Sequence, residues 1–261
     1  MSATAPTPTT TTPAREPVLA RRIEARLRAE IAGDVWFDRV SRGMYATDAS
    51  IYQIMPLGVV VPRTATDVEA TIAIAREHGV PVTARGGGTS QCGQTVNHGL
   101  IVDVSRYMRD VVALDTTART VRVQPGIVLD ELNRVLKKHG LFFPVDPSTA
   151  SRATIGGMTA NNSSGARSIR YGIMADNVVG IDAVLADGAR AYFGEVDGGS
   201  ANGAIAPPRY RELVERVRAI AAREASEIDA RIPKVQRNVG GYAIQTVRPQ
   251  GDFNMAKLLV G

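Results

Sequence analysis

Apolar residues along the first third of the chain recur with two different periods. Residues 16–32 repeat apolar side chains at helical spacing and end at Gly33, which predicts a first helix. An apolar run at 56–62, a polar-capped helical pattern at 64–79 and a second apolar run at 80–84 follow. This order of strand, helix and strand predicts a βαβ unit with a parallel pair of strands.

The rest of the chain carries a less regular pattern. Strands are predicted at 99–105, 110–115 and 120–124, helices at 126–140, 209–225 and 252–261, a hairpin at 177–194, and a flexible linker at 195–208. A plain doubly wound sheet would place helices more regularly between its strands. The pattern therefore predicts an α+β protein with a βαβ-like front lobe and a larger mixed region.

Composition limits the classes of function. The chain has 261 residues, 44% of them hydrophobic, and a net charge of +5 that is spread along the sequence. With 5% aromatic residues and no basic block, we do not expect a nucleic-acid partner. The excess of arginine is interpreted as a solvated surface, with attraction to anionic ligands or to a membrane face as the alternative. Residues 1–14 predict a disordered tail, and no apolar run is long enough for a membrane span.

Cysteine and histidine are sparse. The single cysteine, Cys92, excludes disulfides within this sequence, and three histidines far apart in the sequence favour no metal site. A reducing compartment is the default, so we expect a cytoplasmic protein, with peripheral contact to a membrane as the alternative.

Two stretches carry candidate chemistry. The glycine loop, "ARGGGTSQCGQ" at 84–94, follows a predicted strand, and its backbone N–H groups could converge on an anion such as a diphosphate. It lacks the spacing of a Rossmann fingerprint or a P-loop, and a mobile surface loop is the alternative. The polar wall, residues 142–172, combines glycines with small polar residues and favours contact with a large polar heterocyclic ligand. Its alternative is a long irregular connection.

Several motifs occur together in a fixed order: "YATDASIYQIMPLGVVVPRTATDVEA", "PVTARGGGTSQCGQ", "LIVDVSRYMRDV", "VQPGIVLDELNRVL", the polar wall and "DNVVGIDAVLADG". This set resembles the FAD-binding domain of the p-cresol methylhydroxylase and vanillyl-alcohol oxidase type. It is most similar to the group of D-lactate, glycolate and D-2-hydroxyglutarate dehydrogenases, over about residues 40–261. The resemblance implies one FAD-binding domain at 15–261, with a first lobe at about 57–104 and a second at about 105–261. It also implies that the second lobe is incomplete and that a substrate domain lies beyond residue 261.

The resemblance also implies a set of cofactor-binding residues. The pyrophosphate is assigned to the backbone of Arg85, Gly86, Gly87, Gly88, Thr89 and Ser90, with Gly93 and Gln94 leading toward the flavin. The isoalloxazine and ribityl side is assigned to Pro144, Asp146, Ser148, Thr154, Ile155, Gly156 and Gly157, continued by Asn161, Asn162, Ser164 and Gly165. The adenine side is assigned to Tyr171, Gly172, Asn177, Val179 and Ile181. As alternatives, the paired asparagines could be turn formers, and Val179 and Ile181 strand core.

Two residues bear on how FAD is held. Relatives that attach FAD covalently carry a histidine where this chain has Thr89, so the resemblance implies dissociable FAD. Cys92 is interpreted as a small packed residue, with a reactive thiol as the alternative.

The implied reaction is oxidation of a D-2-hydroxy acid, of the lactate, glycolate or 2-hydroxyglutarate type, by hydride transfer to flavin N5. In such enzymes the base, typically a histidine, lies in the later substrate domain, so no catalytic residue is assigned here and this chain alone is expected to be inactive. The electron acceptor would be a cytochrome, a quinone or an iron–sulfur module. A non-catalytic flavin-binding fragment and an enzyme like UDP-N-acetylenolpyruvoylglucosamine reductase are the alternatives. In "KVQRNVGGYAIQ", Arg237, Asn238 and Tyr242 could face the flavin or substrate, with a structural role for Tyr242 as the alternative.

Overall fold

A computed structural model describes residues 16–196, 208–235 and 241–261. The predicted disordered tail at 1–14, nearly all of the predicted linker at 195–208, and Arg237 with Asn238 lie outside the described residues. Among the described helices, none combines the length and the apolar character needed to cross a membrane.

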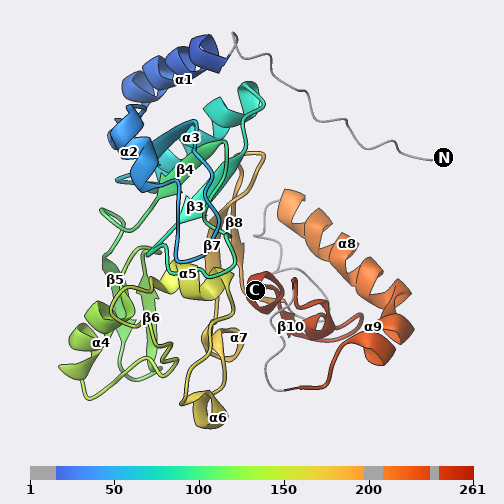
Figure 1. Ribbon diagram of the computed structural model, residues 1–261. Helices are drawn as coiled ribbons and strands as arrows, with labels where there is room; N and C mark the ends of the chain where they lie inside the picture. Colours follow the sequence, from blue (N-terminus) through green and yellow to red (C-terminus); the bar gives the residue numbers. More distant parts are fainter. Residues whose placement is uncertain (1–15, 197–207, 236–240) are drawn as a thin grey trace.

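Residues 16–103 form a four-stranded sheet and the helices that pack with it (Figure 1). Its elements are α1 (Glu16–Glu30), β1 (Asp34–Trp36), α2 (Arg39–Met44), β2 (Gly58–Val61), α3 (Ala65–Glu77), β3 (Val82–Arg85) and β4 (Leu100–Asp103). The predicted helices and strands of this region are confirmed. The sheet order is β1-β2-β4-β3, with β2 and β3 both parallel to β4.

The strand order corrects one expectation. The predicted βαβ unit is confirmed, because β2 and β3 both run parallel to β4, but the two strands are not neighbours, since β4 lies between them. Every residue of β4 is buried, whereas β3 alternates between exposed and half-buried positions. A strand that is apolar on both faces gains most in the middle of a sheet covered on both sides, so β4 is central and β3 forms the edge.

Apolar clusters cover both faces of this sheet. On one face, Ile23 and Leu27 of α1 pack with Ile74 of α3 and Leu100 of β4. On the other, Val59, Val61 and Ile101 pack against aromatic rings from Trp36, Tyr45 and Tyr107. Strands β1, β2 and β4 are thus covered on both faces, and β3, where the glycine loop begins, is held at the edge by its pairing with β4.

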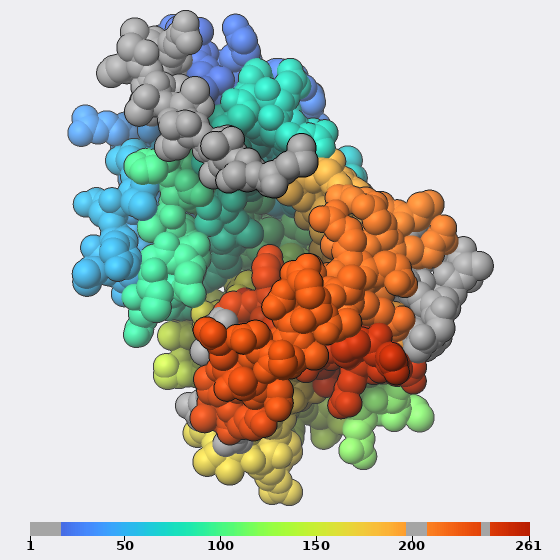
Figure 2. Space-filling model, turned by 90° about the vertical axis from the view of Figure 1, so that its right-hand side faces the viewer, coloured from blue at the N-terminus to red at the C-terminus, as the bar shows by residue number. Residues whose placement is uncertain are grey.

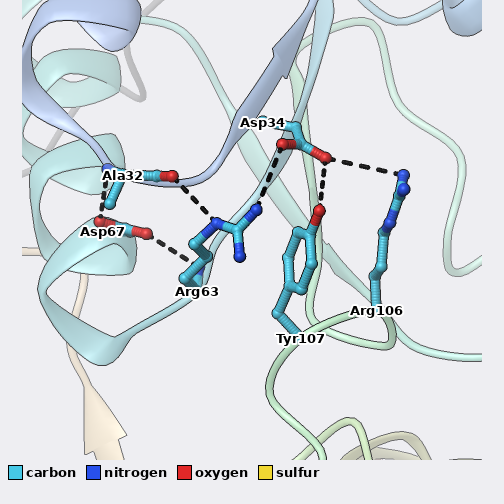
Figure 3. A network of polar contacts seen from close by, with 6 residues as sticks. All are labelled: Ala32, Asp34, Arg63, Asp67, Arg106 and Tyr107. Atoms are coloured by element: carbon cyan, nitrogen blue, oxygen red, sulfur yellow. Dashed lines mark hydrogen bonds and ion pairs between the residues drawn. The ribbon is translucent and has the colours of Figure 1, made fainter.

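A network of polar contacts connects the segments that flank the four-stranded sheet (Figure 3). The Tyr107 hydroxyl donates to Asp34 at 3.0 Å, and the Arg63 guanidinium lies 4.0 Å above the Tyr107 ring. Arg106 pairs with the same Asp34 at 3.6 Å. Asp67 accepts from the backbone N–H groups of Ala32 and Arg63 at 3.1 and 2.8 Å. The network links the start of β1 to the turn after β2 and to the segment after β4.

The chain after β4 forms two-stranded sheets and a series of helices. Its elements are β5 (Val111–Asp115), β6 (Thr120–Val123), α4 (Leu129–Lys137), α5 (Ile155–Ala160), α6 (Ser168–Tyr171), α7 (Met174–Asn177), β7 (Ile181–Val184), β8 (Arg190–Phe193), β9 (Glu195–Val196), α8 (Pro208–Arg223), α9 (Ala225–Arg231), η2 (Ile244–Thr246), β10 (Phe253–Asn254) and α10 (Met255–Leu259). The hairpins β5–β6 and β7–β8 and the helices α4 and α8 confirm the sequence pattern, and the fold is α+β as predicted.

The C-terminal stretch differs from its prediction. A single helix was expected over 252–261, but Phe253 and Asn254 pair with β9 as a short strand. Asn254 then caps α10 by accepting from the N–H of Ala256 at 2.8 Å. The helix therefore begins only at Met255, because an asparagine at the cap position ends the strand and starts the helix.

An exposed contact joins the β7–β8 hairpin to α3. Arg190 of β8 pairs with Glu69 of α3, with one hydrogen bond of 2.9 Å between Nη2 and Oε2. Figure 1 shows α8 and α9 on one side of the molecule and the β5–β6 hairpin with α4 on the other. Figure 2 shows a hollow between the cyan-to-green segments and the orange and red segments.

Candidate functional site

The glycine loop presents unused backbone donors. The ladder of β3 ends where the carbonyl of Arg85 accepts from Val104 N at 3.1 Å. Beyond it, the N–H groups of residues 86–90 find no hydrogen-bond acceptor in the described part of the chain. Such groups are nearly always satisfied by protein, water or ligand, and glycines leave them open to a ligand. A run of N–H donors without acceptors, on glycine-rich backbone, is suited to an anion.

Glycines let the loop lie directly against the beginning of α5. A Cβ on Gly86 would collide with Thr154 Oγ1, and a Cβ on Gly87 with the carbonyl of Arg152. Two stretches separated by more than sixty residues are therefore in contact through backbone. Glycine is needed at 86 and 87 because these two segments of the chain approach each other so closely.

The first turn of α5 has already used its own donors. Thr154 caps the helix by accepting from Gly157 N at 3.2 Å, while Ile155 N and Gly156 N donate to Ile127 and Pro125 carbonyls at 2.9 and 2.8 Å. Gly157 is exposed, and a Cβ there would meet only Thr154 Oγ1, at 3.1 Å. The N–H groups of residues 155–157 are therefore not free for a ligand, whereas the surface at Gly157 is open.

A segment that the sequence analysis did not assign braces the far end of the loop. Ala49 N donates to the Gly88 carbonyl at 3.1 Å, and Thr95 Oγ1 donates to Asp48 at 3.0 Å. Burial acts to raise the pKa of Asp48, but hydrogen bonds from Ser50 and Thr95 outweigh it and hold that pKa below its usual value. The only available signal was the motif "YATDASIYQ", which carries no glycine.

Tyr52 explains one further glycine. Gly93 has φ +75°, and a Cβ on it would lie 2.6 Å from Tyr52 Cδ2. The Tyr52 side chain is half exposed. Glycine is therefore required at 93 both by its backbone conformation and by the ring that packs on it.

Side chains also bridge the two stretches. Gln94 Nε2 donates to Asn161 Oδ1 at 3.3 Å, and the Ser90 hydroxyl donates to Gln94 Oε1. The resemblance placed these residues in one cofactor site, and the structure brings them together.

Other polar residues of the wall hold the wall itself. Asp146 accepts from Arg167 N at 2.9 Å, and its backbone carbonyl leaves no room for a side chain at Gly165. Asn162 is buried at φ +40° and accepts from Ala175 N at 3.0 Å. Asn162 therefore lies in a turn, and its assignment to the cofactor stays a prediction.

The residues assigned to the adenine side are only partly grouped. Asn177 Nδ2 donates to the carbonyls of Tyr171 and Ile173 at 3.0 and 2.9 Å, and Gly172 turns at φ +79°. Ile181 begins β7 and packs in the core, whereas Val179 precedes the strand and is 59% exposed. The alternative of strand core is thus right for Ile181 and wrong for Val179, because the strand begins two residues later.

The remaining candidates lie at the surface or half-buried. Thr89, Pro144 and Ser164 are half-buried, and Ser148 is exposed. Cys92 is exposed, so its interpretation as a packed residue is wrong: it lies in the turn beyond the glycines, where no core reaches it. Tyr242 is 72% exposed. Among the described residues, no group of three or more His, Cys, Asp or Glu side chains is arranged to hold a metal ion.

Comparison with known proteins decides the family. The model of the FAD binding domain family matches residues 56–191, which spans the glycine loop and the polar wall. The chain belongs to this FAD-binding family, the p-cresol methylhydroxylase type. The resemblance inferred from the motifs is confirmed.

Among its relatives, the FAD-binding chain is similar to D-2-hydroxyglutarate dehydrogenase of Pseudomonas putida, at 38% identity over 92% of this chain and 24% of that protein. The glycolate oxidase subunit GlcD of Bacillus subtilis is 37% identical over 61% of this chain and 35% of that protein. The mitochondrial D-lactate dehydrogenase [cytochrome] of Arabidopsis thaliana is 41% identical over 51% of this chain and 24% of that protein. The chain spans about a quarter of the length of the D-2-hydroxyglutarate dehydrogenases that it matches.

Solved structures agree on the fold. The FAD-binding chain superposes on alkyldihydroxyacetonephosphate synthase with a TM-score of 0.57 at 25% identity, covering 66% of this chain and 37% of the other. A carbohydrate oxidase from Microdochium nivale gives 0.57 at 26% identity, covering 65% and 36%. The α+β fold of this family is therefore shown by sequence and by structure.

Proposed function

We propose that the chain is the FAD-binding part of a flavin-dependent dehydrogenase that oxidises a D-2-hydroxy acid of the lactate, glycolate or 2-hydroxyglutarate type. The run of N–H groups without acceptors at 86–90, in contact with the start of α5, carries this proposal. Similarity to a D-2-hydroxyglutarate dehydrogenase, a glycolate oxidase subunit and a D-lactate dehydrogenase supports the substrate class.

The residues present fit FAD. A diphosphate would accept hydrogen bonds from the glycine loop, whose donors have no other partner among the described residues. The open surface at Gly157 and the bridge between Gln94 and Asn161 would lie along the ribityl and flavin side. The side from Tyr171 to Ile181 would take the adenine. In this proposal the first lobe, about 57–104, and the second, about 105–261, hold the cofactor between them.

FAD is proposed to dissociate reversibly. In relatives that hold FAD covalently the loop carries the attaching histidine at the position where this chain has Thr89. The exposed Cys92 lies three residues further on. We expect acid precipitation to release all the flavin into the supernatant.

The chemistry of oxidation would come from the bound flavin, which accepts a hydride from the carbon that carries the substrate hydroxyl. The described part of this chain supplies anion binding and positioning. The base that removes the hydroxyl proton is proposed to lie outside this chain, and the electron acceptor would be a cytochrome, a quinone or an iron–sulfur module.

Two measurements test the proposal. Titration of the chain with FAD, followed by flavin fluorescence, should show saturable binding of one FAD per chain, and absence of binding would overturn the proposal. The full-length protein should then reduce an artificial electron acceptor with D-lactate, glycolate or D-2-hydroxyglutarate. Binding without any turnover would favour a non-catalytic flavoprotein, and oxidation of NADPH with an enolpyruvyl sugar nucleotide would favour a reductase of the same fold.

A further inference from the structure

We infer that Arg85 provides an unpaired positive charge beneath the glycine loop that favours a diphosphate, and that Tyr45 and Asp103 keep this charge from being neutralised within the protein. The inference rests on the proposed function and concerns positioning of the cofactor, not chemistry. Its basis is the arrangement of three side chains behind the loop.

The guanidinium of Arg85 lies directly under the loop. Gly88 adopts φ +63°, and a Cβ on it would be 2.6 Å from Arg85 Nη2. Arg85 Nη1 is buried and has no hydrogen-bond partner in the described part of the chain. The other side of the guanidinium faces the Tyr45 ring, at 5.1 Å from its centroid. The charge is therefore held between an aromatic ring and the backbone that carries the free N–H groups.

The carboxylate of Asp103 is near Arg85 in the sheet, but both of its oxygens already accept hydrogen bonds from other groups. Arg85 and Asp103 are partners in the register of β3 and β4, and Asp103 is buried, yet the two form no ion pair. Asp103 Oδ1 accepts from Ser105 N at 2.8 Å, and Oδ2 accepts from the Tyr45 hydroxyl at 2.6 Å. Burial, and then the hydrogen bond to Asp103, raise the pKa of Tyr45, so its hydroxyl remains a donor at neutral pH.

Arg106, the other arginine near Tyr45, does have a carboxylate partner. Arg106 pairs with Asp34 at 3.6 Å, as Figure 3 shows, and its side chain is about half exposed. Arg85 therefore retains a charge that no carboxylate of the described chain neutralises within ion-pair distance.

Physical reasons connect this charge to the ligand. Arg85 is half-buried, and a partly buried charge without an ion-pair partner is unfavourable, so an anion bound nearby removes part of that penalty. Charges separated by protein interact more strongly than charges separated by water, so Arg85 need not contact the phosphates to attract them. A flavin without phosphate gains nothing from this interaction. Stacking of Arg85 on Tyr45 for stability alone would affect all flavins equally.

The first experiment compares ligands that differ in phosphate. Dissociation constants for FAD, FMN and riboflavin are measured on the wild-type chain, Arg85→Gln, Arg85→Lys and a distant control, Arg216→Gln on α8. We expect Arg85→Gln to weaken FAD by about tenfold and riboflavin by less than about twofold, and Arg85→Lys to retain most of the FAD affinity. Equal weakening of all flavins, or no weakening of FAD, would overturn the inference.

The second experiment tests the role of the neighbours. Tyr45→Phe frees one oxygen of Asp103, which can then pair with Arg85, so FAD should bind several-fold more weakly. In an Asp103→Asn background, where no carboxylate remains, Tyr45→Phe should have no effect on FAD affinity. The same loss in both backgrounds, with unchanged circular dichroism, would contradict the inference. Failure of the wild-type chain to bind FAD would reject the proposed function itself, so the two failures are distinct.

Discussion

The glycine loop and the polar wall look alike in sequence, but they use their polar groups differently. The loop leaves its N–H groups at 86–90 without acceptors in the described chain. In the wall, the side chains of Asp146 and Asn162 accept hydrogen bonds from the backbone of Arg167 and Ala175. Small polar composition therefore predicts a close approach of backbone, and only the balance of donors and acceptors distinguishes a ligand site from a self-supporting turn.

The largest expected effect is at Gly157. Gly157→Asp places a carboxylate in the open space beside the loop, where it repels an anionic cofactor, and we expect no detectable FAD binding. The position is exposed and at the start of a helix, where a negative charge is tolerated, so the melting temperature without FAD should stay within a few degrees of wild type. Retained FAD in this variant would count heavily against the site.

Gly87→Asp sharpens the same contrast. It also abolishes FAD binding, but here a side chain collides with the Arg152 carbonyl, so the apoprotein should lose stability as well. Thermal unfolding without ligand separates the two variants. Gly43→Ala, where a Cβ meets no atom within 4 Å, is the matched control. An equal loss of stability at 87 and 157 would show that both glycines serve packing alone.

Two substitutions test the contact between Gly93 of the glycine loop and Tyr52, which precedes the loop in sequence. Gly93→Ala would force the Tyr52 ring away and distort the loop, so FAD should bind about tenfold more weakly. Adding Tyr52→Ala should restore part of that affinity by removing the collision, although the strain at φ +75° persists. Titration of both variants by fluorescence decides the point. If the two substitutions reduce FAD affinity additively, the collision between Tyr52 and residue 93 is not the cause of the loss. Ile51→Ala, at an exposed neighbour, is the control.

The smallest effect is expected from acid. Asp48 has a lowered pKa in the folded chain, so its anchor to Thr95 is present at neutral pH and is lost as the pH falls through that lowered value. FAD affinity of the wild-type chain should therefore fall slightly more on acidification below about pH 4 than that of Asp48→Asn. If FAD affinity depends on pH in the same way in both proteins, the Asp48 carboxylate does not support the glycine loop.

The sequence predicted the elements better than it predicted their partners. Periodicity located α1, α3, α4 and α8, because each is several turns long and apolar on one face. It did not reveal that β4 separates β2 from β3, since strand order depends on contacts distant in the sequence. The short helices α5 to α7 and the helix α9 were not predicted either.

The site shows the same limit. Glycine content located the loop, and the joint motifs identified the family. Tyr45, Asp103 and Tyr52 were missed because each is an ordinary residue whose role arises only from its neighbours in space. Val179 and Cys92 were misplaced because exposure depends on where a strand begins and on how far the core extends.

Amide hydrogen exchange with and without FAD tests the central claim most directly. The account predicts that the amides of residues 86–90 exchange rapidly in the free chain and become protected when FAD binds, while the amides at 155–157, already bonded to protein, change little. Binding of FAD with no protection at 86–90 would contradict it.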